Sequence, residues 1–423
     1  MFTGKPRHRK RRSQQKREYR LKVWMLTGTG VVLLATVGGL LARAYPRLEA
    51  QMSVTRAQQL LAKGDYAGAI ANASEALSFS DSDLAASRVM ADATAMGHSQ
   101  SELSWAQRLA DLEPTVENKL RLAETGLRCQ NAPYPVSTGV LKDLEGKCSG
   151  NPVFHFLAGL LAKNLQQLDQ AEAQFNAAVQ LDPTNQTYSL YQATVQLRNP
   201  DPVVKKQARQ QLETLGSNGN LGGEAYRALV AERVTAGDDA GARRYSDLLV
   251  ASPQATLTDR LQNLEILHRL NSGGFNLRLQ DTMNIVANNA GAVEELSAWM
   301  QQAGLVEENL AWLDKLPYGI RSEMDYKLAM ARDYLQMGKW QAMLDLIAQD
   351  NWHNMDYLRL ALISHAWAEL GVPTVAQSDW GDAEMQAANH YEAMTNLLSL
   401  AEAWQLTDAQ LNLRHRLMQL PPQ

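Results

Sequence analysis

The stretch "NPVFHFLAGLLAKNLQQLDQAEAQFNAAVQLDPTN", residues 151–185, contains two runs of apolar residues at helical spacing, separated by a polar turn near Gln166. Pro183 cannot continue the second run, because proline lacks the backbone N–H and disfavours the helical conformation of the residue before it. The stretch therefore predicts two antiparallel helices joined by a short turn. The apolar positions are Val153, Phe156, Leu157, Leu160 and Leu161, then Leu168, Ala171, Phe175, Ala178, Val179 and Leu181.

The same pattern recurs along the chain. Copies lie at 60–83, 95–115, 235–254, 330–350 and 401–422. Pro114, Pro183 and Pro253 follow one another at 69 and 70 residues, which is close to two periods of 34 to 35. A fixed period with two helices per unit is typical of an α-solenoid, in which each hairpin buries its apolar face against its neighbours.

The pattern resembles the tetratricopeptide repeat family. Gly159, Ala171, Phe175, Ala178 and Pro183 stand at the spacings of that family. The resemblance extends over about residues 50–423. It implies an all-α, right-handed superhelical solenoid of about eleven helix-turn-helix repeats. We expect a regular array over 50–255, and a degenerate array over 256–423 that ends in a capping helix.

The N-terminus differs from the rest of the chain in charge. Residues 1–47 hold twelve Lys or Arg against Glu18 alone, a net charge of +11. The whole chain has 41 basic and 45 acidic residues, so 29 and 44 remain beyond residue 47, a net charge of −15. An acidic body argues against nucleic acid as a partner.

Residues 23–42 contain no charged side chain. Twenty helical residues span about 30 Å, the thickness of a hydrocarbon core. We therefore expect a basic cytoplasmic tail at 1–22 and a transmembrane helix at 23–43 in contact with the lipid bilayer. By the positive-inside rule, the chain would be a single-pass inner-membrane protein with a periplasmic body. Cleavage as a signal peptide and the inverted, cytosol-facing topology are the alternatives. A homodimer could form through the small residues Ala35, Gly38, Gly39 and Ala42.

No catalytic or cofactor motif was found. The sequence has no HExxH, GxSxG, Walker or GxGxxG pattern in a suitable context, and its eight histidines are scattered. We therefore expect no enzyme, no metal and no cofactor. The two cysteines, Cys129 and Cys148, leave a disulfide open. An oxidising compartment would permit it, whereas a regular hairpin would place the two about 18 Å apart.

The resemblance implies that the first helix of each repeat lines a groove for a protein or peptide. The family's groove positions fall on Val153, Phe156, Leu160, Lys163 and Asn164, and on Asp325, Leu328, Arg332, Leu335 and Gln336. Lys163 and Asn164 are similar to residues that clamp a peptide carboxylate in some members. The predicted function is a membrane-anchored, non-enzymatic scaffold in bacterial secretion, envelope assembly or polysaccharide export. The alternatives are a periplasmic holdase and a cytosol-facing receptor.

Overall fold

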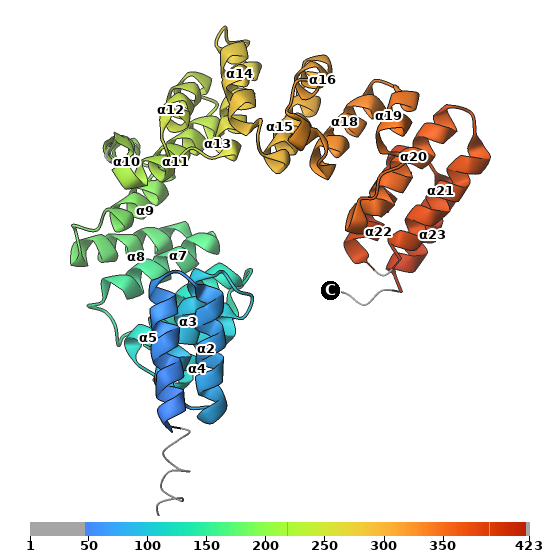
Figure 1. Cartoon of the computed structure of the whole chain (residues 1–423). Helices are drawn as coiled ribbons and strands as arrows, with labels where there is room; N and C mark the ends of the chain where they lie inside the picture. Colours follow the sequence, from blue (N-terminus) through green and yellow to red (C-terminus); the bar gives the residue numbers. More distant parts are fainter. Residues whose placement is uncertain (1–46, 218, 389, 420–423) are drawn as a thin grey trace, which may run out of the picture. The chain divides into compact units, whose positions relative to one another are not determined.

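The computed structural model describes residues 47–217, 219–388 and 390–419, and these residues form helices and turns without a β-strand. Figure 1 shows successive helical hairpins along the chain. Most helices pack against a neighbour in sequence, as α7 does against α8 and α8 against α9. The all-α array of helical hairpins predicted from the sequence is confirmed; the repeat family, the number of repeats and the superhelical hand stay predictions.

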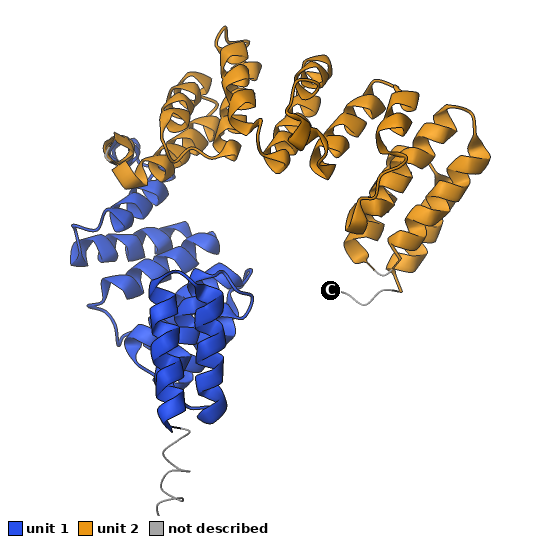
Figure 2. Ribbon diagram, in the orientation of Figure 1, with its two compact units in different colours: residues 1–208 blue, residues 209–423 orange. Residues whose placement is uncertain are grey.

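The helices divide between two compact units, residues 1–208 and 209–423 (Figure 2). The described part of the first unit begins with helical residues 47–62 and continues with α2 (Tyr66–Phe79), α3 (Leu84–Met96), α4 (Glu102–Leu112), α5 (Val116–Cys129), α6 (Pro135–Leu144), α7 (Pro152–Asn164), α8 (Leu168–Leu181) and α9 (Gln186–Gln196). Helix α10 (Pro202–Ser217) crosses the boundary.

The second unit continues to the C-terminus. Its elements are η1 (Gly219–Leu221), α11 (Gly222–Thr235), α12 (Asp239–Ala251), α13 (Leu257–Arg269), α14 (Phe275–Val286), α15 (Ala290–Gln302), α16 (Val306–Leu313), α17 (Tyr318–Arg321), α18 (Met324–Gln336), α19 (Trp340–Ile347), η2 (His353–Met355), α20 (Asp356–Glu369), α21 (Pro373–Gln386), α22 (Tyr391–Ala403) and α23 (Thr407–Leu417).

The hairpin turns keep a common geometry along both units. In ten of them one residue has a positive φ, at Gly64, His98, Tyr134, Gln166, Gly237, Asn271, Gly304, Gly338, Gly371 and Gln405. The last six follow one another at steps of 33 or 34 residues. A left-handed residue ends one helix and reverses the chain into the next. The structural period therefore continues through 256–419, where the sequence pattern of the repeat fades.

Small residues at the helix contacts allow close packing within a hairpin. Gly159 of α7 lies against Phe175 of α8, whose side chain is fully buried. A Cβ atom on Gly159 would stand 2.6 Å from Cε1 of that ring. Ala171 and Ala178 of α8 are also fully buried. The predicted small and large positions of residues 151–185 thus form the contact between α7 and α8.

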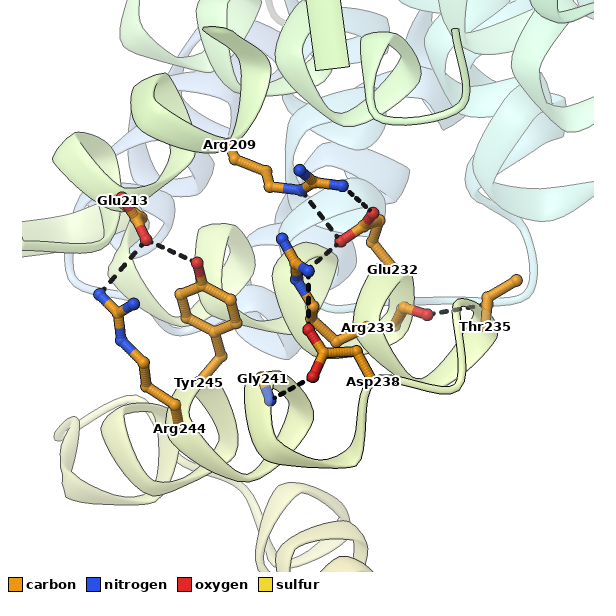
Figure 3. A network of polar contacts seen from close by, with 10 residues as sticks. Arg209, Glu213, Glu232, Arg233, Thr235, Asp238, Gly241, Arg244 and Tyr245 are labelled. Atoms are coloured by element: carbon orange, nitrogen blue, oxygen red, sulfur yellow. Dashed lines mark hydrogen bonds and ion pairs between the residues drawn. The ribbon is translucent and has the colours of Figure 1, made fainter. Parts of the chain in front are cut away.

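The start of the second unit is held by a network of charged side chains (Figure 3). Glu232 of α11 accepts two hydrogen bonds from Arg209, at 2.7 and 3.3 Å, and pairs with Arg233 at 3.1 Å. Arg233 in turn pairs with Asp238 at 2.7 Å. Asp238 caps α12 by accepting from the backbone N–H of Gly241. The network therefore links α10, α11 and α12 through polar side chains.

The predicted membrane location is corrected. Within residues 47–217, 219–388 and 390–419, no helix combines the length and the apolar content needed to cross a membrane. The tail at 1–22, the span at 23–43 and the residues Ala35, Gly38, Gly39 and Ala42 lie outside this described part. The assignment to the inner membrane is therefore wrong by the finding on the described helices.

Candidate functional site

The candidate site lies on the α7 to α9 region of the first unit. Helix α7 begins sharply, because Asn151 accepts hydrogen bonds from the backbone N–H groups of Val153 and Phe154 at 2.9 and 3.2 Å. Pro152 takes the first helical position, where no N–H is needed. This start fixes the register of α7, and with it the positions of Phe156, Leu160, Lys163 and Asn164.

An aromatic cluster joins α7 to α9. The Phe156 ring meets the Tyr191 ring nearly edge-on, with centroids 5.3 Å apart, and lies 5.0 Å from the Tyr188 ring. Phe175 of α8 also contacts Tyr191, at 5.7 Å. Aromatic pairs of this geometry add about 0.5–1.5 kcal/mol beyond the burial of their area. The cluster therefore holds α7 and α9 at a fixed separation.

A pocket of about 210 Å³ opens beside this cluster, where α7 ends, α8 begins and α9 ends. Lys163 Nζ stands 5.0 Å from the centroid of the Tyr191 ring, so the aromatic cluster also positions the ammonium group. The pocket is lined by Tyr134, Lys163, Asn164, Gln166, Leu168, Thr194, Val195 and Arg198.

The charges of this lining favour an anion. Lys163 and Arg198 contribute two full positive charges, and none of the eight lining residues is acidic. The carboxyl ends of α7 and α9 oppose this with about half a negative charge each, while the amino end of α8 adds about half a positive charge. Two full cations therefore outweigh the helix dipoles. Within the described chain, no carboxylate pairs with Arg198.

The neutral polar groups of the pocket offer hydrogen bonds that would orient a bound anion. The Asn164 amide can donate, and the Thr194 hydroxyl donates its proton to the backbone oxygen of Leu190 at 2.7 Å. Thr194 therefore remains an acceptor. A peptide carries a carboxylate close to a backbone N–H group. The carboxylate can meet the cations and the Asn164 amide, and the N–H can donate to the Thr194 oxygen.

The structure brings together only part of the first predicted set. Lys163 and Asn164 line the pocket, and both are half-buried. Phe156 and Leu160 are half-buried and pack against the cores of this region. Val153 lies apart, 41 % exposed in a separate groove of about 450 Å³ beside α5.

The second predicted set lies on α18, in the other unit. Leu328 is 5 % exposed and belongs to a core cluster with α19 and α20, so it offers no surface to a ligand. Arg332 forms an ion pair with Glu294 of α15. Asp325 and Leu335 are half-buried and Gln336 is exposed. The contacts of Leu328 and Arg332 are therefore made within the chain itself.

Both cysteines are free thiols in the structure. Cys129, at the end of α5, places its Sγ 3.7 Å from Oε2 of Glu102, and burial raises the pKa of this thiol. Cys148 is buried after α6, in the core between α5, α6 and α7. The two sulfur atoms are therefore not joined here.

The pocket contains residues that the sequence-based prediction missed. Arg198 lies 35 residues after Lys163, one repeat further along, and Thr194 lies one helical turn before Arg198. The repeat period could have revealed Arg198 as the counterpart of Lys163, although Arg198 lies in the turn just after the next first helix, α9. Tyr134 had no such signal, because it lies in an irregular turn with a φ of 55°.

Comparisons with known proteins add a likeness of fold. A scan against protein-family models finds no match, and no curated protein matches the sequence. Similar solved structures include Cut9 with Hcn1 from the APC/C hetero-tetramer, at 11 % identity and a TM-score of 0.35, covering 92 % of this chain and 81 % of that chain. The human IFIT1 dimer with m7Gppp-AAAA has 13 % identity and a TM-score of 0.36, covering 82 % and 93 %. At these values the likeness extends to neither ligand nor partner.

Proposed function

We propose that the chain is a non-enzymatic scaffold that binds a protein or peptide, and that the pocket at the ends of α7 and α9 receives a carboxylate of that partner. The observation that supports this proposal is the presence of Lys163 and Arg198 together in a lining without an acidic residue. A carboxylate held by a guanidinium and an ammonium group makes charge-assisted hydrogen bonds, which are about twice as strong as neutral ones.

A peptide carboxylate is favoured over a nucleic-acid phosphate for two reasons. The chain beyond residue 47 has a net charge of −15, which repels a polyanion at long range. The pocket also holds about 210 Å³, below the range of about 300–1,000 Å³ in which small-molecule sites usually fall. It therefore fits one acidic group of a larger ligand.

The exposed surface near the pocket offers a path for the rest of the peptide. Tyr191 and Phe156 are half-buried, and Lys163 Nζ stands over the Tyr191 ring. Aromatic rings are frequent anchors at protein interfaces. The narrower role in secretion, envelope assembly or polysaccharide export depended on the corrected membrane location and is not part of this proposal.

Binding of a fluorescent hexapeptide tests the proposal. The peptide carries two aspartates and a free C-terminal carboxylate, and its matched controls replace the aspartates by asparagine or amidate the C-terminus. We expect the acidic peptide to bind the full chain with an affinity that falls as salt rises, because exposed charges are screened. Fluorescence anisotropy measures the dissociation constants. The two controls distinguish a side-chain carboxylate from a terminal one.

Arg198→Ala supplies the decisive variant. We expect about a tenfold loss of affinity, because a hydrogen bond to a charged group contributes about 1.5–3 kcal/mol. Arg244→Ala, which removes an exposed arginine elsewhere in the chain, is the matched control and should leave the affinity unchanged. Equal affinity for the acidic peptide and for a peptide with both changes, asparagine for aspartate and an amidated C-terminus, or displacement of the acidic peptide by single-stranded RNA, would contradict the proposal.

A further inference from the structure

A second groove lies in the second unit, between α14 on one side and α16 with its following turn on the other. Its volume is about 700 Å³. Leu279, Met283 and Leu316 are buried members of the hydrophobic core that also line it, so they form an apolar floor. The groove is therefore larger than the pocket at α7 to α9, and its surroundings are different.

Three amide side chains form one wall of this groove. Asn276, Gln280 and Asn284 follow one another at four-residue steps on α14, and all three line the groove and are exposed. Residues four apart lie on the same face of a helix. Within the described chain, none of the three amides makes a side-chain hydrogen bond. Each keeps its donor and acceptor available for a ligand.

The spacing of these amides matches an extended peptide. Four helical residues rise about 6 Å, and two residues of an extended strand rise about 6.6 Å. The three amides cover about 12 Å in all, the length of four extended residues. Each amide can therefore meet the peptide group of every second residue, accepting from its N–H and donating to its carbonyl oxygen.

The opposite wall carries one ring between two opposite charges. Trp312 of α16 is half-buried and lines the groove, with Glu308 one turn before it and Lys315 just after the helix. Neither Glu308 nor Lys315 forms an ion pair with another described residue. Glu308 lies in the first turn of α16 and Lys315 two residues after its last residue, Leu313, so the two charges lie toward opposite ends of this wall.

We propose that this groove binds an extended peptide segment of about five residues. The amides of Asn276, Gln280 and Asn284 hydrogen-bond alternate peptide groups, and Trp312 and the apolar floor receive an apolar or aromatic side chain. Glu308 and Lys315 pair with a basic and an acidic residue at the two ends of the segment. A helical ligand fits less well, because its backbone groups are already bonded to each other and would leave the amides without partners.

This site is independent of the pocket proposed above. It lies in the other unit, on α14 and α16, the second helices of their hairpins, whereas the first-unit pocket is built mainly on the first helices α7 and α9. In this groove the amides bind the peptide backbone and the two opposite charges bind charged side chains, whereas the first-unit pocket binds a single carboxylate. Either site can therefore fail without the other.

Defined peptides test the groove. The probes are fluorescent, acetylated and amidated pentapeptides with Lys at one end and Glu at the other, in both orders, and with Phe, Leu or Trp in the middle. A second set carries N-methyl groups on alternate backbone nitrogens. We expect saturable binding to the full chain, and about a tenfold loss when one of the two alternate sets of N–H groups is methylated but not the other.

The double variant Gln280→Ala with Asn284→Ala tests the wall. It should weaken binding about tenfold, since two hydrogen bonds are lost, and circular dichroism checks that the helices remain. Asp281→Ala is the matched control, because Asp281 is exposed on the same helix and does not line the groove. Its affinity should equal that of the wild type.

Three results would overturn the proposal. One is the absence of saturable binding by every probe up to about 1 mM, a free energy near −4 kcal/mol. Another is an equal effect of the Asp281 control and the double variant. The third is binding of a soluble oligosaccharide, lost in Trp312→Ala, when no peptide binds. The acidic peptide that probes Lys163 and Arg198 should be unaffected by the double variant.

Discussion

The charged residues of α10 to α12 and those of the α7 to α9 pocket differ in whether acidic residues lie beside the cations. At α10 to α12, Arg209, Glu232, Arg233 and Asp238 pair with one another, so the charges are neutralised within the chain. At the pocket, Lys163 and Arg198 share a lining that has no acidic residue. The first arrangement stabilises a hairpin contact, whereas Arg198 at the pocket has no carboxylate partner within the described chain and remains available to a ligand.

The difference shows how a structural charge can be told from a binding charge. Tyr245 illustrates the structural case: burial, and then its hydrogen bond to Glu213 at 2.5 Å, raise the pKa of its hydroxyl, so it stays a neutral donor at ordinary pH. Burial of a charge without a partner is costly. Arg198, which no carboxylate pairs with in the described chain, is accordingly exposed at the pocket, where water or a ligand solvates it.

The largest expected effect comes from Glu232→Ala. Glu232 is 11 % exposed and pairs with two arginines, so its removal leaves Arg209 and Arg233 without their shared partner. We expect the free energy of unfolding to fall by about 2–3 kcal/mol. Urea denaturation measures this change. Binding of the acidic peptide at Lys163 and Arg198 should not change at a temperature where the variant is folded. If Glu232→Ala also weakened binding of this peptide, the charge network and the pocket would not be independent.

The second-largest loss of stability is expected from filling two close contacts between a glycine and an aromatic ring. A Cβ atom added at Gly159 or at Gly216 would lie 2.6 Å from a ring, that of Phe175 for the first glycine and that of Tyr226 for the second. Alanine at either position should destabilise the chain by about 1–3 kcal/mol through overpacking. Gly139→Ala is the control, because Gly139 is exposed in helix α6 with open space around it.

Thermal denaturation followed by circular dichroism compares these three variants. Gly139→Ala should be neutral or stabilise by about 0.5–1 kcal/mol, since alanine is the better helix former. If Gly159→Ala behaved like Gly139→Ala, the contact between α7 and α8 would tolerate the extra methyl group, and close packing would not explain the glycine.

Asp333 provides a third electrostatic case, a buried acid without a cation. It is fully buried in α18 and accepts hydrogen bonds from Gln301 and Asn309, both at 2.8 Å. Burial raises the pKa of its carboxyl group. The stability that it contributes is therefore present below its ordinary pKa and is lost as pH rises through the folded value.

Asp333→Asn removes this titration. We expect the variant to become more stable relative to the wild type as pH rises from below about 4 to neutral, because the raised pKa of Asp333 costs the wild type stability over this range. Asn309 Oδ1, which has no hydrogen-bond partner in the described structure, can accept from the new amide if its own amide rotates. Urea unfolding at several pH values gives the difference. A constant difference across this range would show that the carboxyl group of Asp333 has an ordinary pKa.

The smallest effect is expected at the edge of the network. Arg244 is 66 % exposed and lies 3.4 Å from Glu213. Exposed ion pairs contribute about 0–1 kcal/mol, so Arg244→Ala should change the free energy of unfolding by less than about 0.5 kcal/mol. A loss comparable to that of Glu232→Ala would mean that exposure does not separate the strong pairs of this network from the weak ones.

The fold could be predicted because each repeat encodes its hairpin locally. Gly159, Phe175 and Pro183 specify a close contact and a stop from nearby residues alone. The sequence pattern faded after residue 256, yet the left-handed turn position continues there, with glycine at Gly304 and a non-glycine residue at Asn271 and Gln405. The backbone period persisted there, since turn geometry tolerates several residues at that position.

The candidate site could be predicted only in part. Lys163 and Asn164 were named from one repeat, but the pocket also needs Arg198 and Thr194 from the next. Whether a groove position is open depends on contacts across repeats, which a single repeat does not contain. Leu328 shows this in the other unit, because it stands at a groove position of the pattern and yet packs into the core with α20.

The most direct test of the central claim is a charge reversal at the pocket. Calorimetry would compare the acidic hexapeptide with its counterpart that has asparagine for both aspartates and an amidated C-terminus, on the wild type and on Arg198→Glu. We predict that the wild type prefers the acidic peptide by about tenfold and that the variant loses this preference, because its new carboxylate neutralises Lys163. An unchanged preference in Arg198→Glu would contradict the account.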